Sequence, residues 1–252
     1  MGKPSHRRRV ADDVAPPIAA VKGFRRAVAL GAVFATALSA WPAAAEDAIG
    51  GDMVVTKGMK PWEGCGECHD LDGVAPNGHF PNLAAQKPSY LRKEMDDFRK
   101  GVRGNDHGQM GTSAREAAGA TLDAVVGYFA GLPPPPPVPM TGLSRKAAVR
   151  AALLVAKGSR ADRIPPCVNC HSPHPKRAFD APWLEAQQPA YLVKELDDFR
   201  SGARTNDPDQ VMEKIAQVLS DDDIAALAQY LASLPRPLAA AQGVAESGGS
   251  RR

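Results

Sequence analysis

The sequence has no apolar run long enough to cross a membrane. Its most apolar stretch, residues 27–40, is about 14 residues long, whereas a membrane-spanning helix needs about 20. This stretch follows Lys22, Arg25 and Arg26 and leads into the small residues 43–45, an order typical of a secretory signal peptide. We therefore expect residues 1–45 to be a leader that is removed on export, with a membrane anchor as the weaker alternative.

The chain also lacks an excess of basic residues once the predicted leader is set aside. The full sequence holds 31 Lys and Arg residues against 28 Asp and Glu residues, a net charge of +3. Residues 1–45 contain seven of the basic and two of the acidic residues, which leaves 24 against 26 and a net charge of −2. Nucleic-acid binding has no support in this composition, and we expect no nucleic-acid partner.

No segment shows the alternation of apolar and polar residues that is typical of a strand, and the apolar residues recur at helical spacing instead. Pro88 and Pro189 suit the first turn of a helix, and Gly101 and Gly202 stand where these two helices would end. Each half has a second predicted helix, the later of which begins at Ser220, whose hydroxyl can cap it. The predicted fold class is all-α. The apolar residues at helical spacing are Tyr90, Leu91, Met95 and Phe98; Leu122, Val125, Val126 and Phe129; Tyr191, Leu192, Leu196 and Phe199; and Ile224, Leu227, Leu231 and Leu234.

One domain occurs twice in the chain. Residues 85–106 and residues 186–207 are identical at 15 of 22 positions. Such a repeat indicates that the two halves share a fold and a chemistry. Consecutive prolines between the halves favour a stiff spacer. The predicted order is a first domain at 46–132, a Pro-rich linker at 133–141, a second domain at 142–237 and a flexible tail at 238–252.

The chain contains only four cysteines, and all four lie in two C-x-x-C-H motifs. The motifs are Cys65, Cys68 and His69 in the first half and Cys167, Cys170 and His171 in the second. C-x-x-C-H is the signature of covalent haem attachment. Two thiols one helical turn apart can add to the two vinyl groups at one edge of a porphyrin, and the next histidine can reach the iron. The motifs therefore predict two covalently bound haem c groups, with His69 and His171 as iron ligands.

Three other uses of the cysteines explain the pattern less well. A structural zinc site would have to join pairs that are 102 residues apart and would not need the adjoining histidines. A thioredoxin-like redox pair belongs in an α/β pattern, which is missing. Structural disulfides are common in exported chains, but they would leave the repeated histidine unexplained.

A methionine is predicted as the sixth ligand of each iron. Met110 lies 41 residues after His69, and Met212 lies 41 residues after His171. Each follows an Asn-Asp pair in a stretch that we expect to be irregular, where a side chain can reach back to the haem. His/Met ligation raises the reduction potential and fills the last coordination position, which favours electron transfer over catalysis. The candidates without a matching ligand in the other half are Met53, Met59, Met95, Met140, His79, His107 and His174.

With these residues in place, the chain resembles the dihaem cytochrome c4 family, which is built from two fused class I cytochrome c domains. The resemblance covers roughly residues 50–235. It includes the segment 81–86 and a longer run in each half, residues 90–110 and 191–212, that begins with Tyr-Leu and ends at the predicted methionine ligand. It implies that the carbonyls of Pro81 and Pro182 accept a hydrogen bond from the haem-ligating histidines, and that the haems face one another across the domain interface. Trp183 and Glu185 depart from the family pattern.

The resemblance implies a periplasmic electron carrier, not an enzyme, that exchanges electrons with redox proteins. A membrane oxidase or a dehydrogenase would be the donor or acceptor, and peripheral membrane association is an open option. The alternative is the cytochrome subunit of a multi-subunit oxidoreductase of the sulfide or thiosulfate dehydrogenase type. A dihaem peroxidase would need an iron with an open position, against which the two methionines argue. An acidic docking face, or simply the solvent face of their helices, is the expected role of Asp96, Asp97, Asp197, Asp198 and the run 221–223.

Overall fold

The computed structural model describes residues 58–176 and 180–237, all of which belong to one compact unit of the chain. Apart from one isolated bridge between Ser159 and Ile164, the regular structure of these residues is helical, which confirms the all-α prediction. Among these residues, no helix combines the length and the apolar character needed to span a bilayer. The predicted leader and the predicted tail lie outside the described residues.

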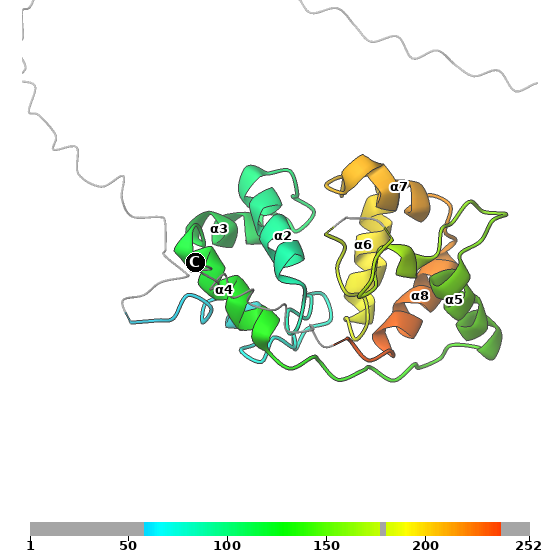
Figure 1. The fold of residues 1–252 in the computed structure, drawn as a ribbon, viewed down its shortest axis with the longest axis horizontal. Coiled ribbons are helices and arrows are strands. Elements are labelled where there is room, and N and C mark those ends of the chain that lie inside the picture. Colours follow the sequence, from blue (N-terminus) through cyan, green and yellow to red (C-terminus); the bar gives the residue numbers. More distant parts are fainter. Residues whose placement is uncertain (1–57, 177–179, 238–252) are drawn as a thin grey trace, which may run out of the picture. The chain divides into compact units, whose positions relative to one another are not determined.

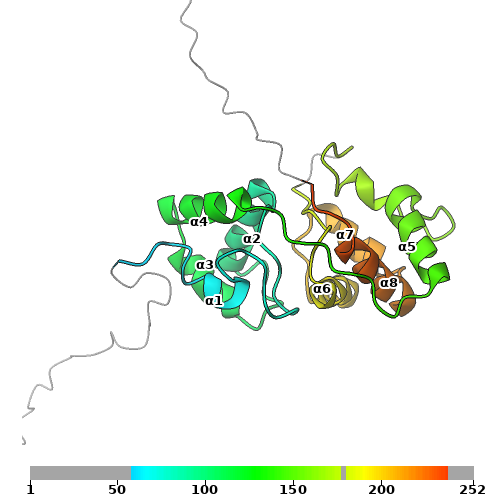
Figure 2. The same ribbon diagram turned by 90° about the horizontal axis from the view of Figure 1, so that it is seen from below.

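The described part of the first half contains four helices (Figure 1 and Figure 2). They are α1 (Gly66–His69), α2 (Pro88–Lys100), α3 (Gln109–Glu116) and α4 (Ala120–Gly131). Helix α2 packs against both α3 and α4. The buried stripe of α4 is the predicted one, namely Leu122, Val125, Val126 and Phe129.

The second half repeats this arrangement and adds a helix before its cysteine motif. Its elements are α5 (Arg145–Lys157), η1 (Cys167–Asn169), α6 (Pro189–Ser201), η2 (Pro208–Gln210), α7 (Val211–Ala216) and α8 (Asp221–Ala232). Helices α5 and α8 lie side by side in both ribbon views, and α6 also packs against α8 (Figure 2). The core between them includes Leu154, Ile164, Leu192, Leu219, Ile224, Leu227 and Leu231.

Helix boundaries follow the predicted start and stop signals. Helices α2 and α6 begin at Pro88 and Pro189, where the missing backbone N–H costs no intrahelical bond. They end before Gly101 (φ 69°) and Gly202 (φ 78°), which adopt the left-handed conformation that favours glycine.

Three helices were missed by the sequence prediction. The residues around Met110 and Met212 were expected to be irregular but form the starts of α3 and α7. Both helices are short and start after left-handed residues, Gly108 and Gln210, so their sequences carry no conventional cap. Helix α5 was missed because it has no recognisable counterpart in the repeat, although Ser144 accepts a capping bond from Ala147 at 3.2 Å.

The predicted linker runs without helix from the end of α4 to the start of α5. Pro135 is buried, and the backbone N–H of Val138 donates to the Ala232 carbonyl at 2.9 Å. The segment is therefore held against the second half rather than hanging free. The domain boundaries themselves stay a prediction.

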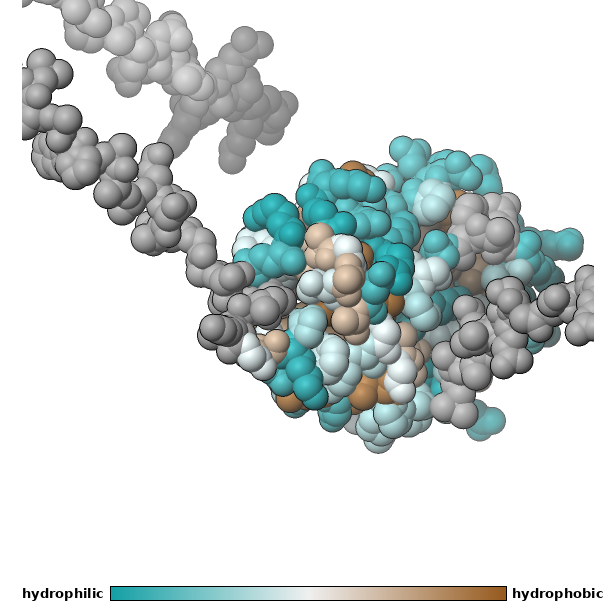
Figure 3. Space-filling model, turned by 60° about the vertical axis from the view of Figure 1, so that its left-hand side comes forward, coloured by the Kyte–Doolittle hydropathy of each residue, from teal (hydrophilic) through white to brown (hydrophobic). Residues whose placement is uncertain are grey.

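Hydrophilic residues predominate on the face shown in Figure 3, with apolar residues interspersed among them. The exposed apolar side chains of the described chain include Leu71, Val102, Val149 and Val218, which come from different elements and loops.

Replacing Ser220 by Ala is expected to lower the free energy of unfolding by about 1 kcal/mol. The Ser220 hydroxyl accepts a hydrogen bond from the backbone N–H of Asp223 at 3.1 Å, and alanine leaves that N–H without its cap. Urea unfolding monitored by circular dichroism measures the loss. Ser220→Thr retains the hydroxyl and serves as the matched control. Equal losses in the two variants would contradict the capping role.

Candidate functional site

A large cavity extends through both halves of the described chain. Its volume is about 1800 Å³. Apolar side chains such as Phe98, Val126 and Phe199 form part of its wall. A haem is a flat, largely apolar ring with a metal at its centre, so an apolar space with metal ligands in its wall fits it. The lining includes every predicted site residue: Cys65, Cys68, His69, Pro81, Met110, Cys167, Cys170, His171, Pro182 and Met212.

Each cysteine motif is wound into a single turn. In the first motif the backbone N–H of His69, the last residue of α1, donates to the Cys65 carbonyl at 3.1 Å. In the second motif the N–H of His171 donates to the Cys167 carbonyl at 2.9 Å, although only the short helix η1 forms there. Both motifs thus place two thiols and one imidazole along one turn at the cavity wall.

Both histidines are buried, and a carbonyl fixes the orientation of each ring. Nδ1 of His69 donates to the Pro81 carbonyl at 3.0 Å, and Nδ1 of His171 donates to the Pro182 carbonyl at 2.9 Å. Burial lowers the pKa of His69 and lowers that of His171 to about 4, so both rings are neutral at pH 7. With the proton on Nδ1, Nε2 keeps its lone pair and can ligate a metal.

The two methionines stand at equivalent places, each as the second residue of a short helix. The backbone N–H of Met110 donates to the Asp106 carboxylate, and that of Met212 donates to the Asp207 carboxylate at 2.6 Å. This explains the Asp of the repeated Asn-Asp pair, which holds the turn that precedes each methionine. Each methionine therefore follows a turn that is stabilised by hydrogen bonds, and not an irregular loop.

The other candidate ligands divide into wall residues and surface residues. Met95 lines the cavity, and so does its counterpart Leu196, which is the behaviour of an apolar wall position. His79 and His107 also border the cavity but are exposed. Met140 and His174 are exposed away from it, Met59 does not line it, and Met53 lies outside the described residues.

The residue after the histidine-binding proline differs between the two halves. Asn82 follows Pro81, and its side chain donates to the Ala186 carbonyl at 2.8 Å. Trp183 follows Pro182, and its buried indole N–H has no partner among the described residues. An unpaired buried donor in a cavity wall fits a bound group that carries acceptors, as the carboxylates of a haem do.

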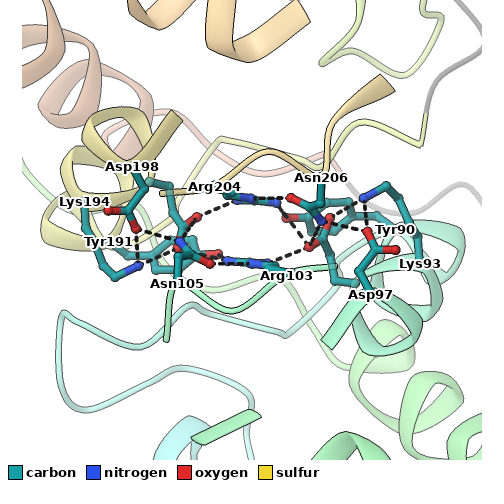
Figure 4. Close-up of polar contacts among 12 residues, drawn as sticks. Tyr90, Lys93, Asp97, Arg103, Asn105, Tyr191, Lys194, Asp198, Arg204 and Asn206 are labelled. Atoms are coloured by element: carbon teal, nitrogen blue, oxygen red, sulfur yellow. Dashed lines mark hydrogen bonds and ion pairs between the residues drawn. The ribbon is translucent and has the colours of Figure 1, made fainter. Parts of the chain in front are cut away.

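A buried network of charges joins the halves across the interface (Figure 4). Arg103 contacts Glu94 of its own half at 2.7 Å and Glu195 of the other half at 2.9 Å. Arg204 mirrors it, contacting Glu195 at 2.6 Å and Glu94 at 3.1 Å. All four residues are only 6 % exposed. Each arginine therefore pairs with one carboxylate from each half, so the network links the halves in a defined orientation.

Two asparagines and two aspartates extend this network. Asn105 and Asn206 come from the repeated Asn-Asp pairs. Asp97 and Asp198 face inward, so both roles expected for them, an acidic docking face and the solvent face of a helix, are wrong. Each asparagine donates to a glutamate and an aspartate of the other half: Asn105 to Glu195 (3.1 Å) and Asp198 (2.6 Å), Asn206 to Glu94 (2.9 Å) and Asp97 (2.7 Å).

Acid is expected to destabilise the protein through the two buried glutamates. Burial raises the pKa of Glu94 and of Glu195, but the charges of Arg204 and Arg103 outweigh it and bring both pKa values to about 2. Because these folded-state pKa values lie below the unfolded ones, the stabilisation is complete above about pH 5 and is lost as the pH falls toward 2. We expect a loss on the order of 3 kcal/mol between pH 5 and pH 3.

Urea unfolding at a series of pH values measures this loss. Glu94→Gln cannot titrate at this position, so the variant should lose about half of the pH dependence. The same pH dependence in the variant and in the parent protein would contradict the assignment.

Sequence reasoning missed the buried polar residues of this site. A signal was available, because Glu94 and Glu195 lie on the apolar face of a predicted helix and both recur in the repeat. Their partners in the other half lie about 90 to 110 residues away, however, and nothing local to either helix identifies those partners.

Comparison with known proteins shows which proteins the chain is similar to. No family model matches it. Cytochrome c4 of Azotobacter vinelandii is 35 % identical over 181 residues, which cover 68 % of this chain and 84 % of that protein. The thiosulfate dehydrogenase electron acceptor of Stutzerimonas stutzeri is 36 % identical over 178 residues, which cover 68 % of this chain and 78 % of that protein. The crystal structure of reduced recombinant cytochrome c4 from Pseudomonas stutzeri has a TM-score of 0.58 at 32 % identity and covers 68 % of this chain and 93 % of that one.

These similarities agree with the two cysteine motifs, the helical fold and the shared cavity. Two covalently bound haem c groups are the cofactors, electron transfer is the function, and other redox proteins are the partners. The chain belongs to the cytochrome c4 family of dihaem electron-transfer proteins.

Proposed function

We propose that the protein is a periplasmic electron carrier without catalytic activity of its own, made of cytochrome domains at 46–132 and 142–237. One observation carries the proposal: both cysteine motifs and both methionines line one cavity. The proposed attachment residues are Cys65, Cys68, Cys167 and Cys170, and the proposed iron ligands are His69, Met110, His171 and Met212.

The protein's part in the reaction is to hold the haem irons by axial ligands and to enclose the haems in the cavity. A bound haem c supplies a one-electron ferric/ferrous couple. His69 and His171 present Nε2 to the cavity because Nδ1 is bound to a carbonyl on the other side of each ring. The thioethers of Met110 and Met212 favour the ferrous state and would fill the remaining axial positions. With both positions filled, oxygen or peroxide has no place to bind, which supports a carrier rather than an enzyme.

The internal path is supported by the interface. The charge network holds the two halves in one orientation, and the cavity is continuous through both. Electrons would then pass between the haems without a domain movement. Export is supported by the signal-like residues 21–45, which lie outside the described residues, and by haem attachment, which takes place outside the cytoplasm.

Purified holoprotein tests the proposal directly. A pyridine haemochrome assay should count two haems, and each should contribute to the red absorption band of methionine bound to ferric iron. Both haems should titrate as one-electron couples, and neither should bind cyanide or peroxide rapidly. A single haem, a missing band, or rapid cyanide binding would contradict the proposed ligation and reopen the enzymatic alternative.

A second candidate is the dedicated acceptor of a dehydrogenase, because a relative at 36 % identity is named a thiosulfate dehydrogenase electron acceptor. Stopped-flow mixing of the oxidised protein with a thiosulfate dehydrogenase and thiosulfate tests it. Reduction within milliseconds, saturating with cytochrome concentration, would favour this role. Reduction no faster than that of an unrelated c-type cytochrome would favour a general shuttle between other donors and an oxidase.

A further inference from the structure

In each half, one glutamine makes two hydrogen bonds to the backbone of the residue that follows the histidine-binding proline of the other half. Gln86 is buried, and its Oε1 accepts from the Trp183 N–H at 2.8 Å while its Nε2 donates to the Trp183 carbonyl at 3.1 Å. Gln187 mirrors it, accepting from the Asn82 N–H at 2.6 Å and donating to the Asn82 carbonyl at 3.1 Å. The two contacts repeat although tryptophan in one half stands where the other has asparagine.

The peptide unit whose N–H binds the glutamine also carries the carbonyl that binds the histidine. The Pro182 carbonyl and the Trp183 N–H belong to a single peptide unit, so the carbonyl accepts from His171 Nδ1 while the N–H donates to Gln86. Hydrogen bonds in such a chain polarise one another. The Gln86 acceptor therefore makes the Pro182 carbonyl a stronger acceptor for the His171 proton.

The same chain exists in the first half. His69 Nδ1 donates to the Pro81 carbonyl at 3.0 Å, and the Asn82 N–H of that peptide unit donates to Gln187. Each chain starts at a histidine of one half and ends on a glutamine of the other.

Backbone strain supports a purpose for these glutamines beyond filling space. The residue before each one, Ala85 or Ala186, has a positive φ of 53° or 49°. This conformation costs an alanine about 1–2 kcal/mol and persists only where the surroundings enforce it. The Ala85 N–H donates to the Phe129 carbonyl and the Ala186 N–H to the Leu231 carbonyl, which hold the strained turn that precedes each glutamine.

We infer that Gln86 and Gln187 are positioning residues through which each half sets the reduction potential of the other half's haem. The inference rests on the proposed ligation by His69 and His171. A stronger bond to Nδ1 gives the imidazole more anionic character, which stabilises ferric iron and lowers the potential. Removing the glutamine of one half should therefore raise the potential of the haem in the opposite half.

The mirror pair Gln86→Leu and Gln187→Leu tests this crosswise effect. An NMR-monitored redox titration of the holoprotein follows the haem methyl signals of each half separately. Gln86→Leu should favour reduction of the second haem by on the order of threefold, about 28 mV since tenfold is 59 mV for one electron. The first haem should stay unchanged. Gln187→Leu should give the reverse pattern, and in each variant the affected histidine's Nδ1 proton should exchange faster with solvent.

The outcomes separate positioning from simple packing. A loosened interface would move both potentials together in both variants, and this result, or a shift confined to the substituted half, would overturn the inference. If Gln86→Leu fails to accumulate as holoprotein, Gln86→Glu keeps the acceptor and should lower the second potential by more than the first, whereas equal shifts would again overturn it. Parent protein without two His/Met haems would overturn the proposed function and the inference together, while a missing crosswise response would overturn the inference alone.

Discussion

Replacing Met212 by His is expected to lower the reduction potential of the second haem by on the order of 0.2 V, within the roughly 0.8 V range that axial ligands span. The substitution exchanges a thioether, which favours ferrous iron, for an imidazole, which favours ferric iron. The Met212 backbone is fixed by Asp207 at 2.6 Å, so the new side chain starts from the same point on the cavity wall. The first haem should keep its potential.

The red absorption band of the ferric protein gives the matching spectroscopic result. Because only Met110 would still be bound to iron, the band should fall to about half of its amplitude per protein. Met95→Leu is the matched control, since Met95 lines the same cavity and its counterpart in the other half is already Leu196. A full band in Met212→His, or a halved band in Met95→Leu, would show that the wrong methionine has been assigned.

Replacing Arg204 by Met is expected to lower the free energy of unfolding by about 3–5 kcal/mol. Arg204 contacts Glu195 at 2.6 Å and Glu94 at 3.1 Å, and its guanidinium carbon lies 4.5 Å from the Phe199 ring centroid. Methionine fills much of the same space but leaves two buried carboxylates with only Arg103 as their arginine partner. Uncompensated buried charge is the costly consequence, more than the loss of the ion pairs themselves.

Unfolding in guanidinium chloride measures this loss of free energy, and Arg200→Met is the control variant. Arg200 pairs with Asp197 and Asp221 at 2.6 Å each, but its side chain is one-third exposed and Asp221 is almost fully so. Exposed ion pairs contribute about 0–1 kcal/mol, so this variant should be close to the parent protein. Similar losses in both variants would contradict a special role for the buried network.

The buried network also explains why the two halves can act as one unit. Charged residues that satisfy each other only in one arrangement penalise every other arrangement of the halves, because each alternative would leave a buried charge unpaired. The glutamine contacts to residues 82 and 183 depend on that same arrangement. The interface is thus both a mechanical link and the route by which one half contacts the surroundings of the other half's haem.

The sequence alone determined the features whose causes are local. Two cysteines and a histidine on one helical turn require only a few adjacent residues, and so do the ends of α2 and α6 at a proline and a glycine. The repeat likewise singled out Met110 and Met212 from the other methionines as the predicted axial ligands. The local patterns act over a few residues and the repeat compares the chain with itself, so both can be read without knowing what packs against them.

The tertiary structure alone decided the roles of the polar residues between the halves. Glu94 and Gln86 have partners in the other half that lie about 90 to 110 residues away along the chain, and the pattern of neither segment predicts these hydrogen bonds. The starts of α3 and α7 were missed for a different and local reason, because a carboxylate four or five residues before each methionine and a left-handed residue replace the usual cap. A buried polar side chain is specified by the group that meets it, and only the folded chain brings that group into contact.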